Sequence, residues 1–249
     1  MHIRVVTPIT TPGFTAASDF EPLARQDTVV SHTELATGPA SIESAFDEAL
    51  ALPGTIARII EAERDGADAV VIDCFGDPGV DAGREATGIT VLGPAQVSMH
   101  LAAMLGHRFS IITVLDAVVP LIDDLATKYG LHDKLASIRV VDIPVLDLGD
   151  HQRLVDALAD EAVKAVVEDG AHAIVFGCTG MRGCAAGLKR SLEEKGYHGI
   201  PVIDPVVAAF KIAEALVDLG LTPSKRTYPT PRSKPLVGYE QLAAAQAGA

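Results

Sequence analysis

The chain has 249 residues, of which 48% are hydrophobic, and a formal net charge of −13 from 33 acidic and 20 basic side chains. This charge disfavours nucleic acid as a partner, because nucleic-acid-binding proteins carry a basic surface. No apolar run reaches the ~18 residues that a membrane helix needs, and the N-terminus lacks the charged region and cleavage site of a signal peptide. We therefore expect a cytoplasmic protein that binds neither membrane nor nucleic acid.

Short apolar strands alternate with amphipathic helices along the chain. The predicted strands cover residues 3–7, 28–32, 69–73, 90–92, 109–113, 137–141, 173–177 and 201–204. The predicted helices include residues 52–65, 94–105, 118–129, 154–169 and 206–219. Several strands are unbroken runs of Val and Ile, which is typical of parallel strands covered by helices on both faces. The pattern predicts an α/β fold.

One phrase occurs twice in the sequence. Residues 65–79 read DGADAVVIDCFGDPG and residues 169–183 read DGAHAIVFGCTGMRG, so Cys74 aligns with Cys178 at an offset of 178 − 74 = 104 residues. The heptapeptide GITVLGP, which begins at residue 88, matches GIPVIDP, which begins at residue 199, at an offset of 199 − 88 = 111 residues. Duplication on this scale predicts two similar halves and excludes a solenoid, whose repeats are much shorter.

We interpret the two halves as pseudo-symmetric parallel-sheet α/β domains with the active site in the cleft between them. The first domain is expected to comprise residues 1–97 together with 206–222, because the last helix should pack back on the first half. The second domain is expected to comprise residues 98–205. Residues 223–249 are rich in proline and small residues, which predicts an extended C-terminal tail.

Each of the matched cysteines stands where a predicted strand ends. Ligands of parallel α/β sheets bind beyond the carboxyl ends of the strands, so Cys74 and Cys178 are candidate catalytic residues. A thiol has a pKa of ~8.5 that falls near helix N-termini, so one thiolate could remove a proton beside a carbonyl while the other thiol protonates the opposite face. Backbone N–H groups of the loops would stabilise the enolate oxygen. This chemistry needs no metal and no cofactor.

Other features of the cysteines and their loops favour structural roles. An isolated cysteine at a buried strand end is most often a small core residue. Cys184 has no counterpart in the first half and lies in a predicted helix, so we interpret it as a packing residue. Asp77 and Pro78 predict the start of a helix, with Asp77 as its N-cap. Three cysteines in a chain of this length do not form a disulfide framework, and their spacing does not fit a zinc site.

At these motifs the chain resembles the aspartate/glutamate racemase superfamily and, within it, the hydantoin racemase branch, which includes allantoin racemases. The segments that carry the resemblance are CFGDPG at residues 74–79, GCTGM at residues 177–181 and GPASIES at residues 38–44. The resemblance covers most of residues 1–220. It implies a cofactor-independent racemase of 5-substituted hydantoins or allantoin, with Cys74 and Cys178 as its two bases, and a homo-oligomer.

The resemblance also implies that backbone amides after each cysteine, together with hydroxyl groups from other loops, hold a small-molecule substrate. The substrate-binding residues expected on this basis are Thr10, Phe75, Gly76, Thr113, Thr179 and Gly180. The branch usually carries an Asn in its first loop, where this chain has Ile9. That difference leaves the exact substrate open.

Three other interpretations remain open from the sequence. An aspartate/glutamate-type amino-acid racemase or a maleate-type cis–trans isomerase of the same superfamily would act on carboxylate substrates. A two-lobed small-molecule-binding protein would have no need of matched thiols. A redox dithiol would form a disulfide between Cys74 and Cys178, but no Cys-x-x-Cys motif supports it.

Overall fold

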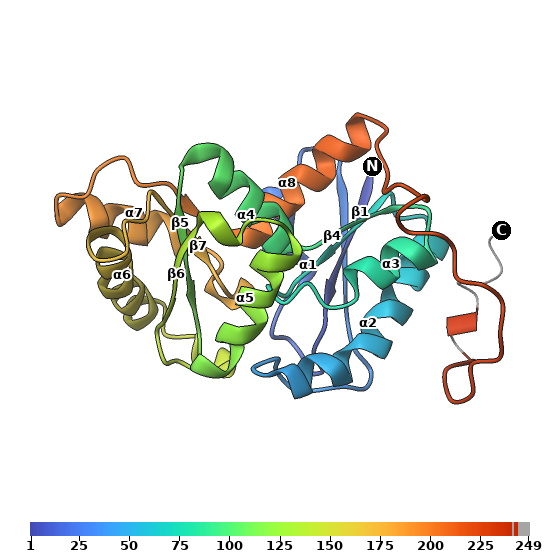
Figure 1. Cartoon of the computed structure of the whole chain (residues 1–249). Coiled ribbons are helices and arrows are strands. Elements are labelled where there is room, and N and C mark those ends of the chain that lie inside the picture. The colour runs from blue at the N-terminus through green and yellow to red at the C-terminus, as the bar shows by residue number, and fades with distance from the viewer. Residues whose placement is uncertain (241, 244–249) are drawn as a thin grey trace. The chain divides into compact units, whose positions relative to one another are not determined.

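The computed structural model describes residues 1–240 and 242–243, and the chain divides into two compact units. Unit 1 contains residues 1–42, 46–93 and the C-terminal segment from residue 209, and unit 2 contains residues 43–45 and 94–208. Each unit is built on a parallel four-stranded sheet flanked by helices (Figure 1). The predicted α/β class, with two similar parallel sheets, is confirmed.

The sheet of unit 1 has the strand order β2-β1-β3-β4, and all neighbouring strands are parallel. Its strands are β1 (His2–Thr7), β2 (Val29–Glu34), β3 (Ala69–Ile72) and β4 (Thr90–Leu92). The helices of this part of the chain are α1 (Ala17–Phe20), α2 (Ala45–Arg64) and α3 (Val80–Ala86). All four residues of β3 are buried, because helices cover both faces of a parallel sheet, and this explains the unbroken apolar run in the sequence.

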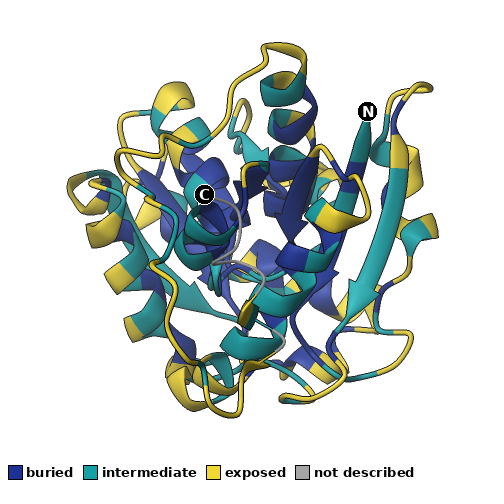
Figure 2. Ribbon diagram, turned by 90° about the vertical axis from the view of Figure 1, so that its right-hand side faces the viewer, coloured by how far each residue is buried: buried dark blue, intermediate teal, exposed yellow. Residues whose placement is uncertain are grey.

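Unit 2 repeats this arrangement with the strand order β6-β5-β7-β8. Its strands are β5 (Phe109–Thr113), β6 (Leu135–Val140), β7 (Ala173–Phe176) and β8 (Val202–Ile203). Its helices are α4 (Pro94–Leu105), α5 (Val119–Lys128), α6 (His151–Val167) and α7 (Ala185–Glu194), and α8 (Pro205–Asp218) begins here and ends in unit 1. Strands β3, β5 and β7 are buried along their whole length, whereas the edge strands β2 and β6 are mostly of intermediate burial (Figure 2).

The matching strand orders make β1 the counterpart of β5, β3 the counterpart of β7 and β4 the counterpart of β8. The repeated phrase of the sequence therefore corresponds to β3 and β7 with the loops that follow them. The second matched pair of segments corresponds to β4 and β8, each of which is followed directly by a helix. The duplication in sequence is thus a duplication of topology.

Helix α2 begins at Ala45, earlier than the predicted start at residue 52, and Pro53 lies inside it. A proline disfavours helical conformation in the residue before it, which is why the sequence pattern places the start of the helix close to Pro53. The observed first turn instead contains Asp47 and Glu48, whose charges suit the positive end of the helix dipole. No helix in the described part of the chain is both long and apolar enough to cross a membrane.

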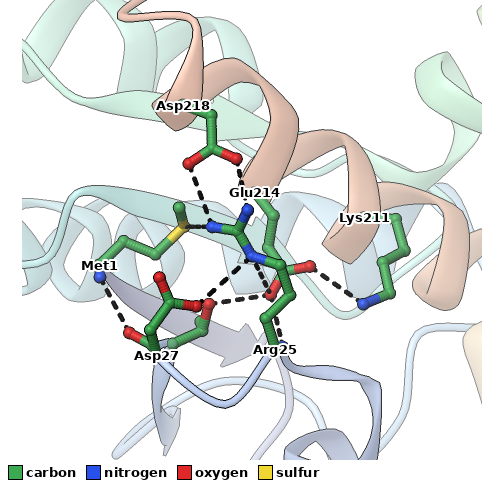
Figure 3. A network of polar contacts seen from close by, with 7 residues as sticks. Met1, Arg25, Asp27, Lys211, Glu214 and Asp218 are labelled. Carbon is green, nitrogen blue, oxygen red and sulfur yellow. Dashed lines mark hydrogen bonds and ion pairs between the residues drawn. The ribbon is translucent and has the colours of Figure 1, made fainter.

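In unit 1 a buried carboxylate ties the last helix to the segment before β2 (Figure 3). Glu214 Oε1 accepts the backbone N–H of Arg25 and the hydroxyl of Thr28, both at 2.9 Å, and Oε2 accepts from Lys211 Nζ at 3.0 Å. Asp218 pairs with the Arg25 guanidinium one turn further along the helix. Glu214 is only 3% exposed, so these contacts fix the later turns of α8 on unit 1.

Candidate active site

Both cysteines leave their sheets at equivalent points. The residue before the first cysteine, Asp73, donates its backbone N–H to the carbonyl of Val6 on β1 at 2.8 Å. The residue before the second cysteine, Gly177, donates its N–H to the carbonyl of Ile112 on β5 at 2.7 Å. Each cysteine therefore directly follows the last backbone bond between the two central strands of its unit. This is the carboxyl edge of the sheet, where ligands of parallel α/β sheets bind.

The turns that follow the two cysteines also match. Each cysteine carbonyl accepts the N–H of the residue three positions further on, Asp77 in unit 1 and Met181 in unit 2, at 3.2 Å in both cases. Gly79 and Gly183, at equivalent places in the two loops, have φ angles of +76° and +84°. Glycine adopts this left-handed conformation without the steric cost that a Cβ would bring. The two loops therefore share a hydrogen bond and a left-handed glycine, but they differ at the third residue, where Asp77 has a φ of +52° and Met181 ends a 3₁₀ turn.

The three cysteines of the chain differ in accessibility. Cys74 and Cys178 are partly exposed and are not in a disulfide, whereas Cys184 is 1% exposed and lies 3.6 Å from His151 Nδ1. Burial raises the pKa of the Cys184 thiol to about 11, and the nearby carboxylate of Asp204 adds to the rise. Cys184 is thus a packing residue in its surroundings, as the sequence led us to expect.

We expect this difference to be visible by alkylation. At about pH 8 only roughly one Cys184 thiol in a thousand would be ionised, and the thiolate is the form that reacts with iodoacetamide. Native protein that is alkylated and then digested should carry label on Cys74 and Cys178 but not on Cys184, while denatured protein should carry label on all three. Labelling of Cys184 in the native protein at the same rate as the other two would contradict the expectation.

A buried polar cluster lies beside the first cysteine. The hydroxyl of Thr7, at the end of β1, donates to Asp73 Oδ2 at 3.1 Å. The same hydroxyl oxygen lies 2.8 Å from Thr15 Oγ1 and 2.9 Å from His32 Nε2. The cluster joins the ends of the first three strands and holds the residue before Cys74 by its side chain. Sequence reasoning did not predict Thr15 or His32, because neither belongs to a motif.

In unit 2 the counterpart of Thr7 is Thr113, at the end of β5, whose hydroxyl donates to the backbone carbonyl of Gly177 at 3.1 Å. The residue before each cysteine is thus held by a threonine in both units, through a carboxylate in unit 1 and through the backbone in unit 2. Gly177 has no room for a side chain, since an added Cβ would lie 2.8 Å from both Ile111 Cγ2 and Thr113 Cβ. Close packing of β7 on β5 therefore explains why a glycine precedes the second cysteine.

Replacing Gly177 by alanine is expected to lower the free energy of unfolding by about 2 kcal/mol, because the added methyl group overpacks a site bounded by the backbone of β5. Chemical denaturation monitored by circular dichroism measures this loss. Gly149→Ala is the matched control, since a Cβ at Gly149 would meet no atom within 4 Å. The control should remain within about 0.5 kcal/mol of the parent protein. Equal stability of the two variants would contradict the packing argument.

The predicted binding residues of unit 1 lie on both sides of the first cysteine turn. The side chain of Phe75 is buried, at 3% exposure, so only its backbone is available to a ligand. An added Cβ on Gly76 would lie 3.7 Å from Cys74 Sγ and 2.6 Å from Glu48 Oε2. Glu48, from the first turn of α2, thus brings a carboxylate next to the cysteine turn, which no sequence motif indicated. Thr10 donates its hydroxyl to the carbonyl of Pro39 at 3.1 Å.

The predicted binding residues of unit 2 lie in a short 3₁₀ turn, Thr179–Met181, that follows Cys178 directly. Thr179 is buried at 6% exposure, and Gly180 is partly exposed. The hydroxyl of Thr113 is used in the bond to Gly177 described above. In the described part of the chain, no three His, Cys, Asp or Glu side chains are grouped so that they could hold a metal ion.

The expected role of Asp77 as a helix cap is wrong. Helix α3 begins at Val80, its N-cap is Gly79, and no side chain caps it. Asp77 has a φ of +52° and is 5% exposed. In this left-handed conformation the carboxylate of Asp77 lies close to Gly93 instead of capping α3.

Comparison with known proteins shows the class to which this duplicated α/β fold belongs. A family model for Asp/Glu/hydantoin racemases matches residues 3–213, and the chain belongs to this family. It is accordingly an isomerase of the racemase type, as the sequence predicted.

Several proteins of named activity are similar to this chain over nearly its whole length. The hydantoin racemase of Pseudomonas sp. (strain NS671) is 43% identical over 242 residues, which cover 96% of this chain and 95% of the relative. The hydantoin racemase of Rhizobium meliloti is 41% identical over 98% of this chain and 100% of its own length. Among solved structures, the allantoin racemase from Klebsiella pneumoniae has a TM-score of 0.87 and 36% identity, and covers 97% of this chain and 98% of the other.

Proposed function

We propose that the protein racemises the chiral carbon of a five-membered cyclic ureide, a 5-substituted hydantoin or allantoin, with Cys74 and Cys178 as its two bases and without a cofactor. One thiolate takes the proton from the chiral carbon and becomes a thiol, while the electron pair of the C–H bond moves into the adjacent carbonyl to form an enolate. The other thiol then gives its proton to the opposite face of the carbon and becomes a thiolate. The reverse reaction uses the two residues in the opposite order.

The observation that carries this proposal is the repetition of one cysteine turn in both units. Two bases that exchange roles in the two directions need similar surroundings, and Cys74 and Cys178 have the same backbone turn, the same place at a sheet edge and similar accessibility. The proposal requires that the two thiols face one substrate from opposite sides. Backbone N–H groups of the two turns would stabilise the enolate oxygen as its charge develops.

The proposed substrate class rests on the named activities of the relatives and on the charge near Cys74. Hydantoins and allantoin are uncharged near neutral pH in their reacting ring and carry several N–H and C=O groups. The carboxylate of Glu48 beside Gly76 can accept a hydrogen bond from a ring N–H, whereas it would repel a dicarboxylate such as aspartate. The net charge of −13 likewise gives no general attraction for anionic substrates.

Purified protein should be tested with single enantiomers of several 5-substituted hydantoins and of allantoin, and with aspartate, glutamate and maleate as comparison substrates. For reactions in heavy water, chiral chromatography follows inversion and mass spectrometry of the separated enantiomers follows exchange of the proton on the chiral carbon. We expect inversion with solvent deuterium in the product for at least one ureide. Inversion of free amino acids alone would replace the substrate proposal, and tight binding without exchange would indicate a binding protein.

We also propose that the protein is a cytoplasmic homo-oligomer. The three cysteines are not in disulfides, which suits a reducing compartment. The C-terminal segment carries Val237 at 88% exposure and Tyr239 at 47%, and exposed apolar side chains of this kind favour contacts with another subunit. Light scattering of the purified protein should give a multiple of the monomer mass. A monomer at micromolar concentration would contradict the proposal.

A further inference from the structure

A single buried carboxylate holds the loop that follows Cys178. Asp204 is the last residue before helix α8 and is 8% exposed. Its Oδ2 accepts the backbone N–H of Gly183 at 3.0 Å, and its Oδ1 accepts the N–H groups of Val206 and Val207 at 3.2 and 3.3 Å. Asp204 therefore links the end of the cysteine loop to the first turn of the next helix.

In unit 1 the equivalent place, between the cysteine loop and the residue before the next helix, is filled by a carboxylate that belongs to the loop. Gly93 is the last residue before helix α4, as Asp204 is before α8. A Cβ built on Gly93 would overlap the carboxylate group of Asp77, which lies three residues after Cys74. The Asp77 carboxylate thus occupies the space in which a side chain at position 93 would begin. It is buried, at 5% exposure.

The duplication shows that the two units carry the carboxylate at opposite members of one pair of equivalent positions. The offset of 181 − 77 = 104 residues pairs Asp77 with Met181, and the offset of 204 − 93 = 111 residues pairs Gly93 with Asp204. In unit 1 the loop supplies the carboxylate and the position before the helix is a glycine. In unit 2 the position before the helix supplies it and the loop carries a fully buried methionine. Two carboxylates in one such place would repel each other at short range.

We propose that Asp77 and Asp204 are equivalent positioning residues, each of which fixes the cysteine loop of its unit against the segment that precedes the next helix. Their common task is to hold the backbone N–H groups that follow the cysteine. The inference rests on the proposed function, because the placement of these loops matters to a rate only if the cysteines act on a substrate. It adds that the carboxylate can come either from the cysteine loop or from the residue before the next helix.

The chemistry of the site explains why asparagine cannot replace Asp204. All three bonds at the carboxylate are accepted from backbone N–H groups, and they use both oxygens. An asparagine side chain has one acceptor oxygen and one NH₂ group. The NH₂ group, a donor, would therefore face either the N–H of Gly183 or the N–H groups of the first turn of α8, which are donors too. Burial raises the pKa of Asp204, although these N–H groups lower it in part, which agrees with a carboxylate deep in the protein.

The test transfers the unit 1 arrangement into unit 2. Asp204→Gly should lower kcat for ureide racemisation by about tenfold or more with KM changed less than about twofold, because a loosened loop misplaces groups that act in the transition state. The double variant M181D/D204G, which places the carboxylate on the loop as in unit 1, should return kcat to within about threefold of the parent. Asp204→Asn should resemble the glycine variant and not the double variant.

The control separates loop position from general stability. Asp169 lies before β7, at the opposite end of that strand from Cys178, and pairs with Arg139 at 2.6 Å. Asp169→Asn should lower the thermal midpoint without lowering kcat at a temperature where all variants are folded by circular dichroism. The proposal is overturned if Asp204→Gly keeps the parent kcat, if it loses no more kcat than Asp169→Asn, or if a folded M181D/D204G stays as slow as Asp204→Gly.

Amide hydrogen exchange distinguishes this inference from the proposed function itself. Residues 179–184 should exchange at least about tenfold faster in Asp204→Gly than in the parent, with protection restored in M181D/D204G. This readout needs no substrate. If the parent protein racemises no ureide, the proposed function fails while the exchange data still decide whether the carboxylate holds the loop. Unchanged exchange in Asp204→Gly would overturn the positioning role.

Discussion

Serine in place of either Cys74 or Cys178 is expected to lower the rate of ureide racemisation by a factor of about 10³, the usual scale of a lost general acid or base. A serine hydroxyl is close in shape to a thiol, but its pKa lies far above neutral pH, so it can neither take nor return the proton at a useful rate. Chiral chromatography of single-enantiomer substrate measures the loss. Both variants should keep the unfolding midpoint of the parent within a few degrees.

Proton exchange in heavy water sharpens this prediction. In each single variant the remaining thiolate can still remove the proton from the enantiomer that faces it. We therefore expect Cys74→Ser and Cys178→Ser to exchange solvent deuterium into opposite enantiomers without inverting them. Cys184→Ala is the control and should stay within about twofold of the parent, since its thiol is buried. Exchange into the same enantiomer by both serine variants would exclude bases on opposite faces.

Replacement of Glu214 by alanine is expected to have the largest effect on stability, with a loss of about 3 kcal/mol. The variant leaves the N–H of Arg25 and the hydroxyl of Thr28 without their acceptor in a buried place, and it removes the partner of Lys211. For a chain of this size the thermal midpoint should fall by about 6–12 °C. Glu194→Ala, at an exposed position of α7, should change stability by less than about 0.5 kcal/mol.

The contribution of Glu214 should also depend on pH. Burial raises the pKa of this carboxyl, but the N–H of Arg25, the ammonium of Lys211 and the hydroxyl of Thr28 outweigh burial and hold the pKa below its ordinary value. A carboxyl whose pKa falls on folding stabilises the protein above its unfolded pKa of ~4.3, and this stabilisation disappears as the pH falls through the folded pKa. The stability difference between the parent and Glu214→Gln should therefore be full at about pH 7 and shrink at about pH 3. A difference independent of pH would contradict this.

Features that depend on local pattern were predictable from the sequence. The duplicated phrase located β3 and β7, because an apolar run bounded by turn residues is a short-range signal. The two copies of the phrase occupy equivalent strands of the two sheets, so the fold repeats the duplication of the sequence. The catalytic roles of the two cysteines remain a proposal.

Features that depend on contacts between distant residues were not predictable. The cluster around Thr7 joins Thr15 and His32, and the carboxylate of Glu48 reaches Gly76 from a helix that starts in another part of the chain. The sequence around Asp77 matches a helix cap, yet the turn imposed by the preceding cysteine directs its carboxylate elsewhere. A local pattern cannot report such a choice, because the competing partner is defined only by the folded backbone.

The equivalent positions of the two cysteines have a thermodynamic consequence for the resting enzyme. On the proposed mechanism, each turnover leaves the protein with the proton on the other sulfur, so the free enzyme exists in two forms. A difference of one pKa unit between the thiols, or about 1.4 kcal/mol, would leave the minor form at roughly a tenth of the population. The proposed mechanism therefore requires that this difference be small. A resting population that contains both forms can bind either hand of the substrate, whereas repeated conversion of one hand requires proton exchange with water to restore the starting form.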